Sequence, residues 1–375
     1  MGKTVTSVHS DFQMLAQRRG ASFRDKNSLN ALSVFAQLCV GFSLYLYGRV
    51  STPGYLSVLL SAPVVPLLFL PGWFLSRRKK PGLSVLASAA GKKGAKVYFL
   101  CFFALHLLDA QLAFFALCAV VKDVMPDFSP TFAALAAAVF CFLGGDSRES
   151  LPRLARFLKW LIGLMLFYCL AIAVPYGRTA HFFPLLGYGP ASILQGALWI
   201  SGASASCVWP LLARAEDDQP AGFFPVLLSP LAAVGWGTVT YLAAVWLMPV
   251  YAMQRPQSLG WRMLLLVHMT PSVPAWSMAV IGLTLLLLTA LSYSVSQAAF
   301  ALSQFGGSQK TPRFLYAALF MLPIPACVLD PDAAQAALAA AAPWRSLAYF
   351  TLLCLLCLRC AIRNRKKRSG REEAG

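Results

Sequence analysis

Charged residues are scarce in this chain of 375 residues: they make up 12% of it, whereas hydrophobic residues make up 58%. An ordinary soluble domain carries about twice that share of charge, so the composition excludes a soluble globular protein. The mean hydropathy of +0.64 points the same way. The sequence therefore predicts a polytopic membrane protein.

Motifs of catalysis and of cofactor binding are also missing. The chain contains no GxSxG, no HExxH and no phosphate-binding loop, each of which places reactive groups at a fixed spacing. Cys354, Cys357 and Cys360 have the rhythm of a metal site, but no histidine or carboxylate stands beside them. Packing is the favoured role for these thiols, as for most cysteines in apolar segments. Neither an enzyme nor a bound cofactor is expected.

Long apolar runs fill most of the chain. A hydrocarbon layer of about 30 Å needs about 20 apolar residues per helix, and ten segments are read as membrane spans. They are residues 28–48, 54–75, 97–121, 130–144, 157–174, 190–213, 224–249, 274–305, 312–329 and 341–358. Residues 1–27 form a basic segment without a cleavable signal, so the first span is expected to direct insertion. Residues 359–375 form a basic tail.

The lysines and arginines test this count, because loops on the cytoplasmic side retain positive charge. With charges near span ends counted in the adjoining loops, 26 of the 32 Lys and Arg fall in the two ends and in the even-numbered loops. The remaining 6, with Arg345 among them, fall in the odd-numbered loops. This asymmetry predicts ten spans with both termini cytoplasmic. The basic runs at 77–80, 91–96 and 363–368 then face anionic lipids, and the absence of a nucleic-acid-binding module excludes nucleic acid as a partner.

The sixth span loses its bulky side chains at its middle, where it reads SGASAS (201–206). Gly202 weakens a helix, and Ser201, Ser204 and Ser206 can bond nearby backbone groups. A backbone opened in this way is tolerated in a membrane only where it lines protein or a water-filled cavity. These four residues are therefore candidates for ligand binding. The alternative is that small residues simply allow close helix packing.

The first span carries a similar interruption at Gly41 and Ser43. In a chain built from two inverted five-helix halves, the first and sixth helices occupy corresponding positions. Paired interruptions there indicate a binding site near the bilayer midplane. The predicted fold is therefore an all-α membrane protein with a leucine-transporter-type 5+5 inverted repeat and broken helices one and six.

An ionisable pair lies near the centre of the third span. Asp109 and His106 are three residues apart and share a helical face. A carboxyl group at that depth is costly and faces either a cavity or a partner. Asp109 is a candidate to bind a ligand or couple a proton or cation, and the alternative is a paired aspartate that ties helices together. His106 is a possible coupling residue, although a hydrogen-bonded packing role is favoured.

The eighth span has a polar stripe at its middle. Ser292 and Ser296 are four residues apart and Tyr293 is adjacent, so one face could line a polar pathway. Tyr293 is included among the candidate ligand-binding residues. Further out, the run WRMLLLVHM (261–269) predicts a re-entrant or interfacial helix.

The order of these segments resembles the endospore germination permeases, the integral membrane subunits of nutrient germinant receptors. The clearest parts are FFPLLGYGPASILQGALWISGASAS (182–206), GKKGAKVYFLCFFALHLLDAQLAFF (91–115) and VMPDFSPTFAALAAAVF (124–140). The resemblance extends over about residues 28–358 and places the chain in the amino acid, polyamine and organocation transporter superfamily. Where many relatives carry a glutamate near the broken part of helix six, this chain reads SASCVW (204–209).

The resemblance implies a pocket between helices one, three, six and eight that takes an amino acid or another small nutrient. It also implies two partner subunits, a larger membrane subunit and a lipoprotein, in the inner membrane of a spore. A signalling receptor is the first hypothesis for function. The second is a secondary amino acid transporter in which Asp109 couples proton or cation movement to flux, and a channel-like subunit is a third.

Overall fold

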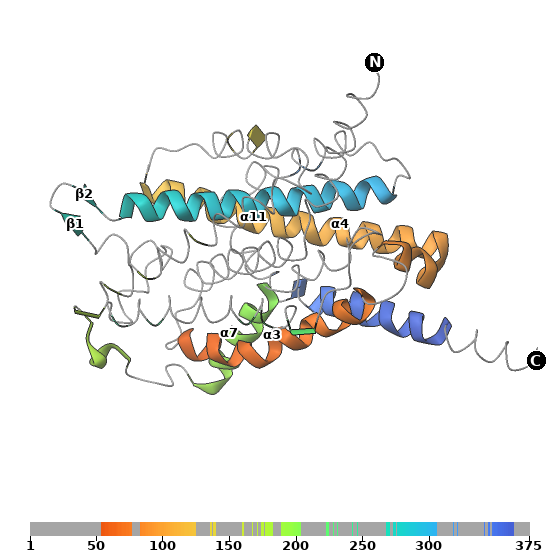
Figure 1. Ribbon diagram of the computed structural model, residues 1–375, viewed down its shortest axis with the longest axis horizontal. Helices are drawn as coiled ribbons and strands as arrows, with labels where there is room; N and C mark the ends of the chain where they lie inside the picture. The colour runs from red at the N-terminus through yellow and green to blue at the C-terminus, as the bar shows by residue number, and fades with distance from the viewer. Residues whose placement is uncertain are drawn as a thin grey trace, which may run out of the picture.

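The computed structural model describes residues 54–76, 83–124, 177–182, 189–203, 268–270, 273–274, 276–305 and 347–363, together with isolated residues between them. These segments are helical apart from a short two-stranded sheet and residues next to the helices (Figure 1). Isolated described residues in four other predicted spans, for example Val139, Phe167, Leu228 and Ala318, are also helical. The first predicted span lies outside the described residues.

Helix α3 covers Gly54–Ser76, so the predicted second span is helical. Three prolines, Pro63, Pro66 and Pro71, lie inside it. Each proline removes a backbone donor, and a membrane helix tolerates this where neighbouring groups satisfy the carbonyls that are freed. Helix α7, which covers Pro190–Ala203, packs against α3.

Helix α4 covers Leu83–Val124 and begins well before the predicted third span, which starts at residue 97. Its two parts meet at Gly91, where φ is 74° and ψ is 170°. Only glycine adopts this conformation at little cost. The GKKGAK run, expected in a loop, thus forms the kink and the first turns of the spanning part. Within the described residues, Lys93–Phe115 is the one stretch long and apolar enough to cross a bilayer, and Leu59–Leu75 is a shorter apolar helix.

Helix α11, which covers Trp276–Phe305, runs alongside α4 (Figure 1). Its bounds agree with those of the predicted eighth span to within two residues at its start. Ala298, Ala299 and Ala301 of α11 are fully buried, and such small side chains let helix backbones approach closely.

A short antiparallel pair precedes α11. Strand β1 (His268–Thr270) pairs with β2 (Val273–Pro274). The helix predicted over 261–269 is therefore wrong at its end, where the backbone is extended. Pro271 follows β1 directly, and a residue that precedes proline favours extended over helical backbone.

A C-terminal helix covers residues 347–363, with helical residues also at 341 and 344–345. The predicted tenth span is thus helical where it is described, and the helix extends beyond residue 358. The Cys357 thiol donates a hydrogen bond to the Pro71 carbonyl of α3 at 3.4 Å, and the Arg359 guanidinium lies next to Gly94 of α4. The end of α3, the start of the spanning part of α4 and the end of this helix therefore meet, as alternating spans require.

A second junction joins the segment before α7 to Trp246, near the end of the predicted seventh span. The Arg178 amide donates to the Trp246 carbonyl at 3.0 Å, and the His181 ring nitrogen Nδ1 lies 3.1 Å from the same oxygen. His181 belongs to the 3-10 helix η1, Thr179–Phe182. Alternating spans place both segments on one side of the membrane, and this contact agrees with that prediction.

Gly177 lies directly against the indole ring of Trp246, and a Cβ atom built on Gly177 would overlap the ring. We expect Gly177→Ala to lower the free energy of unfolding by about 1–3 kcal/mol, because the ring must shift from its packed position. Thermal unfolding of the purified protein in detergent measures the change. Thr179→Ala, an exposed change in the same segment, is the control. A Gly177→Ala variant as stable as the parent would contradict the close contact.

Candidate functional site

The two ionisable residues predicted near the centre of the third span lie on the inner face of α4. Asp109 is 2% exposed and His106 is 1% exposed. Three helical residues advance the chain by about one turn, so both side chains point the same way. The same face carries Phe102, which is fully buried. Asp109 therefore faces a protein partner and not lipid.

That partner is Arg345, just before the C-terminal helix. Its guanidinium nitrogen Nη1 lies 2.5 Å from Asp109 Oδ1, and both side chains are almost completely buried. Arg345 lies inside the predicted tenth span, but its charge was counted with the adjoining external loop, which is wrong because the residue is 4% exposed. The predicted charge asymmetry is unchanged by this correction, since it removes one positive charge from the odd-numbered loops, which already hold fewer lysines and arginines.

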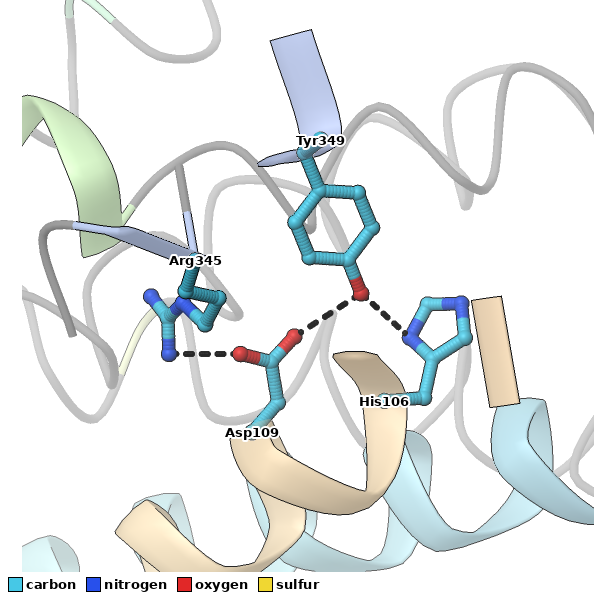
Figure 2. Close-up of polar contacts among 4 residues, drawn as sticks. All are labelled: His106, Asp109, Arg345 and Tyr349. Atoms are coloured by element: carbon cyan, nitrogen blue, oxygen red, sulfur yellow. Dashed lines mark hydrogen bonds and ion pairs between the residues drawn. The ribbon is translucent and has the colours of Figure 1, made fainter. Parts of the chain in front are cut away.

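Tyr349, one helical turn after Arg345, completes the group (Figure 2). Its hydroxyl donates to Asp109 Oδ2 at 3.2 Å and lies 3.0 Å from His106 Nδ1. A phenol has a single proton to donate, so the hydroxyl that donates to Asp109 accepts a hydrogen bond from His106 Nδ1–H. His106 thus carries its proton on Nδ1 in this arrangement. We name His106, Asp109, Arg345 and Tyr349 the polar quartet.

Aromatic rings enclose one side of the quartet. The rings of Phe102 and His106 are stacked with centroids 6.5 Å apart, and the Tyr349 ring lies 5.7 Å from His106 and 6.2 Å from Phe102. Such contacts exclude water from the hydroxyl and the carboxylate. In a medium of low dielectric constant, hydrogen bonds and ion pairs strengthen, and the cost of an unpaired charge rises.

Tyr293 of α11 belongs to the same region. It is 2% exposed and lies within electrostatic range of Tyr349. Three residues singled out by sequence, His106, Asp109 and Tyr293, are therefore brought together. The flanking Ser292 and Ser294 are both 3% exposed, so this part of α11 is buried on more than one side.

Sequence reasoning missed two members of the quartet, Arg345 and Tyr349. The available signal was an arginine inside the predicted tenth span, four residues before a tyrosine. On a helix, residues four apart lie on one face. An intramembrane arginine on the same face as a tyrosine is typical of a polar contact with another span.

The small residues of the sixth span are only partly described. Ser201 and Gly202 are helical within α7, and the Ser201 hydroxyl donates to the Ala197 carbonyl one turn back at 2.7 Å. The helix is thus unbroken at these two positions, which corrects the prediction that the backbone opens there. A serine that bonds to the carbonyl four residues earlier is compatible with a continuous helix. Gly41, Ser43, Ser204 and Ser206 lie outside the described residues, and their roles stay predictions.

Three cysteines, Cys354, Cys357 and Cys360, lie on the C-terminal helix. None of the three is joined in a disulfide. Among the described residues no group of three His, Cys, Asp or Glu side chains is arranged to hold a metal ion. Cys360 is 3% exposed, and Cys357 bonds to α3, so these two thiols contribute to helix packing as predicted.

Comparison with known proteins gives a fold and not a family. No family model matches the chain, and no curated protein matches it. Solved structures do match over most of its length at low sequence identity. One is the Eremococcus coleocola manganese transporter in complex with an aromatic bis-isothiourea substituted compound, with a TM-score of 0.53 and 13% identity. The match covers 91% of this chain and 86% of that one.

Two further transporters are similar. One is Mhp1, a nucleobase-cation-symport-1 family transporter in a closed conformation with bromovinylhydantoin bound. The match has a TM-score of 0.56 and 11% identity, and it covers 85% of this chain and 75% of the Mhp1 chain. The other is a sodium-coupled sialic acid symporter in a substrate-bound outward-open state. The match has a TM-score of 0.56 and 14% identity, and it covers 91% of this chain and 82% of the symporter chain. The chain therefore has the helical fold of leucine-transporter-type secondary transporters, and it is a multi-pass membrane protein.

Proposed function

We propose that this protein is the integral membrane subunit of a spore germinant receptor, which binds a small nutrient near the membrane midplane and signals germination. The expected ligand is an amino acid. Support comes from the resemblance over about residues 28–358 and from the transporter fold. Two of the similar structures are described with a small molecule bound and a third with its substrate. Selective binding by one conformation is enough to shift an equilibrium between two states.

The observation that carries the receptor proposal is the pairing of Asp109 with Arg345. A carboxylate that couples ion flux must exchange its positive partner during each cycle. Asp109 already holds a permanent cation, because an arginine does not lose its proton in a protein. Tyr349 occupies the other carboxylate oxygen. The quartet is suited to joining α4 to the C-terminal helix and transmitting a conformational change between them, with no requirement for a coupling ion at Asp109.

The proposed ligand pocket lies between helices one, three, six and eight. We place Gly41 and Ser43 on its first-helix side and Tyr293 on its eighth-helix side. Since α7 is helical through Ala203, the opening of the sixth helix is proposed to lie at Ser204 and Ser206. In this assembly the partners are a larger membrane subunit and a lipoprotein, and the location is the inner membrane of a spore.

The alternative is a proton- or cation-coupled amino acid transporter. The fold favours it, because the similar structures are secondary transporters and one is sodium-coupled. The quartet also offers a short proton path from His106 through the Tyr349 hydroxyl to Asp109. In this alternative, protonation of Asp109 releases Arg345 once per cycle.

Reconstitution in liposomes separates the two functions. Each of the twenty common amino acids serves in turn as a radiolabelled probe. We expect at least one of them to bind saturably without accumulating in the liposomes when a pH or sodium gradient is imposed. Asp109→Asn is expected to weaken that binding about tenfold or more, because it leaves the Arg345 charge buried without its counter-ion. Leu194→Ala, an exposed change on α7, is the matched control.

Two results would count against these assignments. Saturable accumulation driven by either gradient, and lost in Asp109→Asn, would replace the receptor with the coupled transporter. Binding in Asp109→Asn with the affinity and pH dependence of the parent would remove Asp109 from the functional residues altogether.

A further inference from the structure

A side-chain contact joins α4 to the predicted ninth span. The Gln111 side-chain nitrogen Nε2 donates a hydrogen bond to the Met321 carbonyl at 3.5 Å, across 210 residues of the chain. The two residues lie close to the centres of the predicted spans 97–121 and 312–329. Both groups are therefore expected near the middle of the bilayer, where an unpaired amide or carbonyl is costly.

The Met321 carbonyl cannot receive the donor that an α-helix usually supplies. In an α-helix a carbonyl accepts from the N–H four residues later, and the residue four positions after Met321 is Pro325. Proline has no N–H to donate. Ala318 is helical and fully buried, whereas Met321 lies in a turn and is 41% exposed. The Gln111 amide thus meets a carbonyl whose usual helical donor is missing.

Gln111 lies on the more exposed face of α4. Val97, Leu100 and Ala104 precede it at a spacing of three or four residues, and all three are exposed. Gln111 follows Ala104 by about two helical turns, so it continues the same face and is half-buried there. Asp109 points elsewhere, because two residues turn a helix by about 200°. Helix α4 therefore presents the polar quartet on one face and Gln111 on another.

The two contacts of α4 differ in strength. The quartet joins α4 to the C-terminal helix through a buried ion pair, and the Tyr349 hydroxyl donates to the same carboxylate. The Gln111 contact is a neutral hydrogen bond of 3.5 Å, and it is exposed. A charged hydrogen bond is about twice as strong as a neutral one, and a long bond is weaker still. The C-terminal helix is therefore expected to stay with α4 when the Gln111 contact is released.

We propose that Gln111 replaces the backbone donor that Pro325 lacks, and that its bond to Met321 is a releasable tie between α4 and the predicted ninth span. A side-chain donor can leave the carbonyl without unwinding the hydrogen bonds of α4. One such bond biases an equilibrium by about two- to tenfold, which a modest difference in binding affinity between two states can reverse. Release of the tie lets α4 and the C-terminal helix shift together against the ninth span. The proposal goes beyond the nutrient-binding function and does not depend on it.

Hydrogen–deuterium exchange of the full-length protein in nanodiscs, without added nutrient, tests the tie. Gln111→Met removes the amide and keeps an unbranched side chain of similar length. We expect it to speed exchange in peptides from residues 312–329 by about two- to tenfold and to leave exchange in residues 347–363 unchanged. The unfolding temperature is expected to stay within about 2 °C of the parent, because the lost bond is local.

Pro325→Ala shows whether Gln111 acts through the Met321 carbonyl. Alanine supplies an N–H at position 325, so we expect Gln111→Met to change exchange by less than about twofold in this background. Pro323→Ala is the matched control. Its new N–H is four residues after Leu319 and not after Met321, so Gln111→Met should keep its full effect in that background.

Three results would overturn the proposal. Unchanged exchange in Gln111→Met would show that the bond does not hold the ninth span. Equal effects of Gln111→Met in the parent and in Pro325→Ala would show that the missing proline N–H does not create the need for this donor. Faster exchange in all spans, with an unfolding temperature clearly below that of the parent, would show a general loss of stability in place of a local tie.

Discussion

Arg345→Ala is expected to lower the free energy of unfolding by about 3–5 kcal/mol, the typical cost of breaking a buried ion pair by removing one partner. The pair joins Asp109 to a residue far along the chain, with both side chains at most 3% exposed. Without the guanidinium, the carboxylate keeps the Tyr349 hydroxyl as its donor but has no counter-charge in a region closed to water. The purified protein in nanodiscs, unfolded by heat and by denaturant, provides the measurement.

The double variant Asp109→Asn/Arg345→Gln is the control for charge. It removes both charges while keeping side chains of similar size, so we expect it to recover more than half of the stability lost in Arg345→Ala. Tyr349→Phe removes only the hydroxyl and should cost less, about 1–3 kcal/mol, because the ring contacts remain. An Arg345→Ala variant within experimental error of the parent would show that the contact contributes nothing to stability.

Much of the helical layout could be predicted from hydropathy alone. The observed α3 and α11 agree with the predicted spans to within one or two residues, because apolar runs of that length have few other structures available in a membrane. The start of α4 differed for a physical reason. Lysines were taken to mark a loop, whereas Lys93 and Lys96 are exposed on the first turns of the spanning helix. Long basic side chains extend along a helix to reach the interface.

The polar quartet could be predicted from the sequence only in part. Asp109 could be singled out because a carboxylate in an apolar run is costly. Its partners could not be identified in this way. Tyr349 is 240 residues away from Asp109 in the chain, and only the packing of the two helices brings them together. Arg345 also lies near a span end, where charge counting assigns an arginine to the loop. The described contacts pair Asp109 with Arg345 and place His106 beside Tyr349, and the binding and coupling roles of Asp109 and His106 stay predictions.

The sixth helix is another place where sequence and structure differ. Small residues at 201–206 were interpreted as an opened backbone, but Ser201 and Gly202 are helical. Glycine and serine lower helix propensity by no more than about 1 kcal/mol each, which packing against α3 readily offsets. Composition therefore located a run of small residues but did not predict that its first two lie within a helix.

Gly202→Leu is expected to abolish ligand binding while leaving the protein folded and inserted. Gly202 has helical backbone, and leucine is a better helix former than glycine by about 0.8–1.0 kcal/mol. The substitution therefore imposes no backbone strain, and any loss of binding reflects the added side chain. Radiolabelled amino acids measure binding in nanodiscs, and thermal unfolding confirms the fold.

Ala191→Leu is the matched control for Gly202→Leu, because it adds a branched side chain of the same kind at an exposed position on α7. We expect it to bind like the parent. Retained binding in Gly202→Leu would place the ligand away from the small-residue surface of the sixth helix, so that Gly202 would serve helix packing alone. Loss of binding in Gly202→Leu together with normal unfolding assigns that surface to the ligand, because a leucine at this position needs space that a bound nutrient would otherwise occupy.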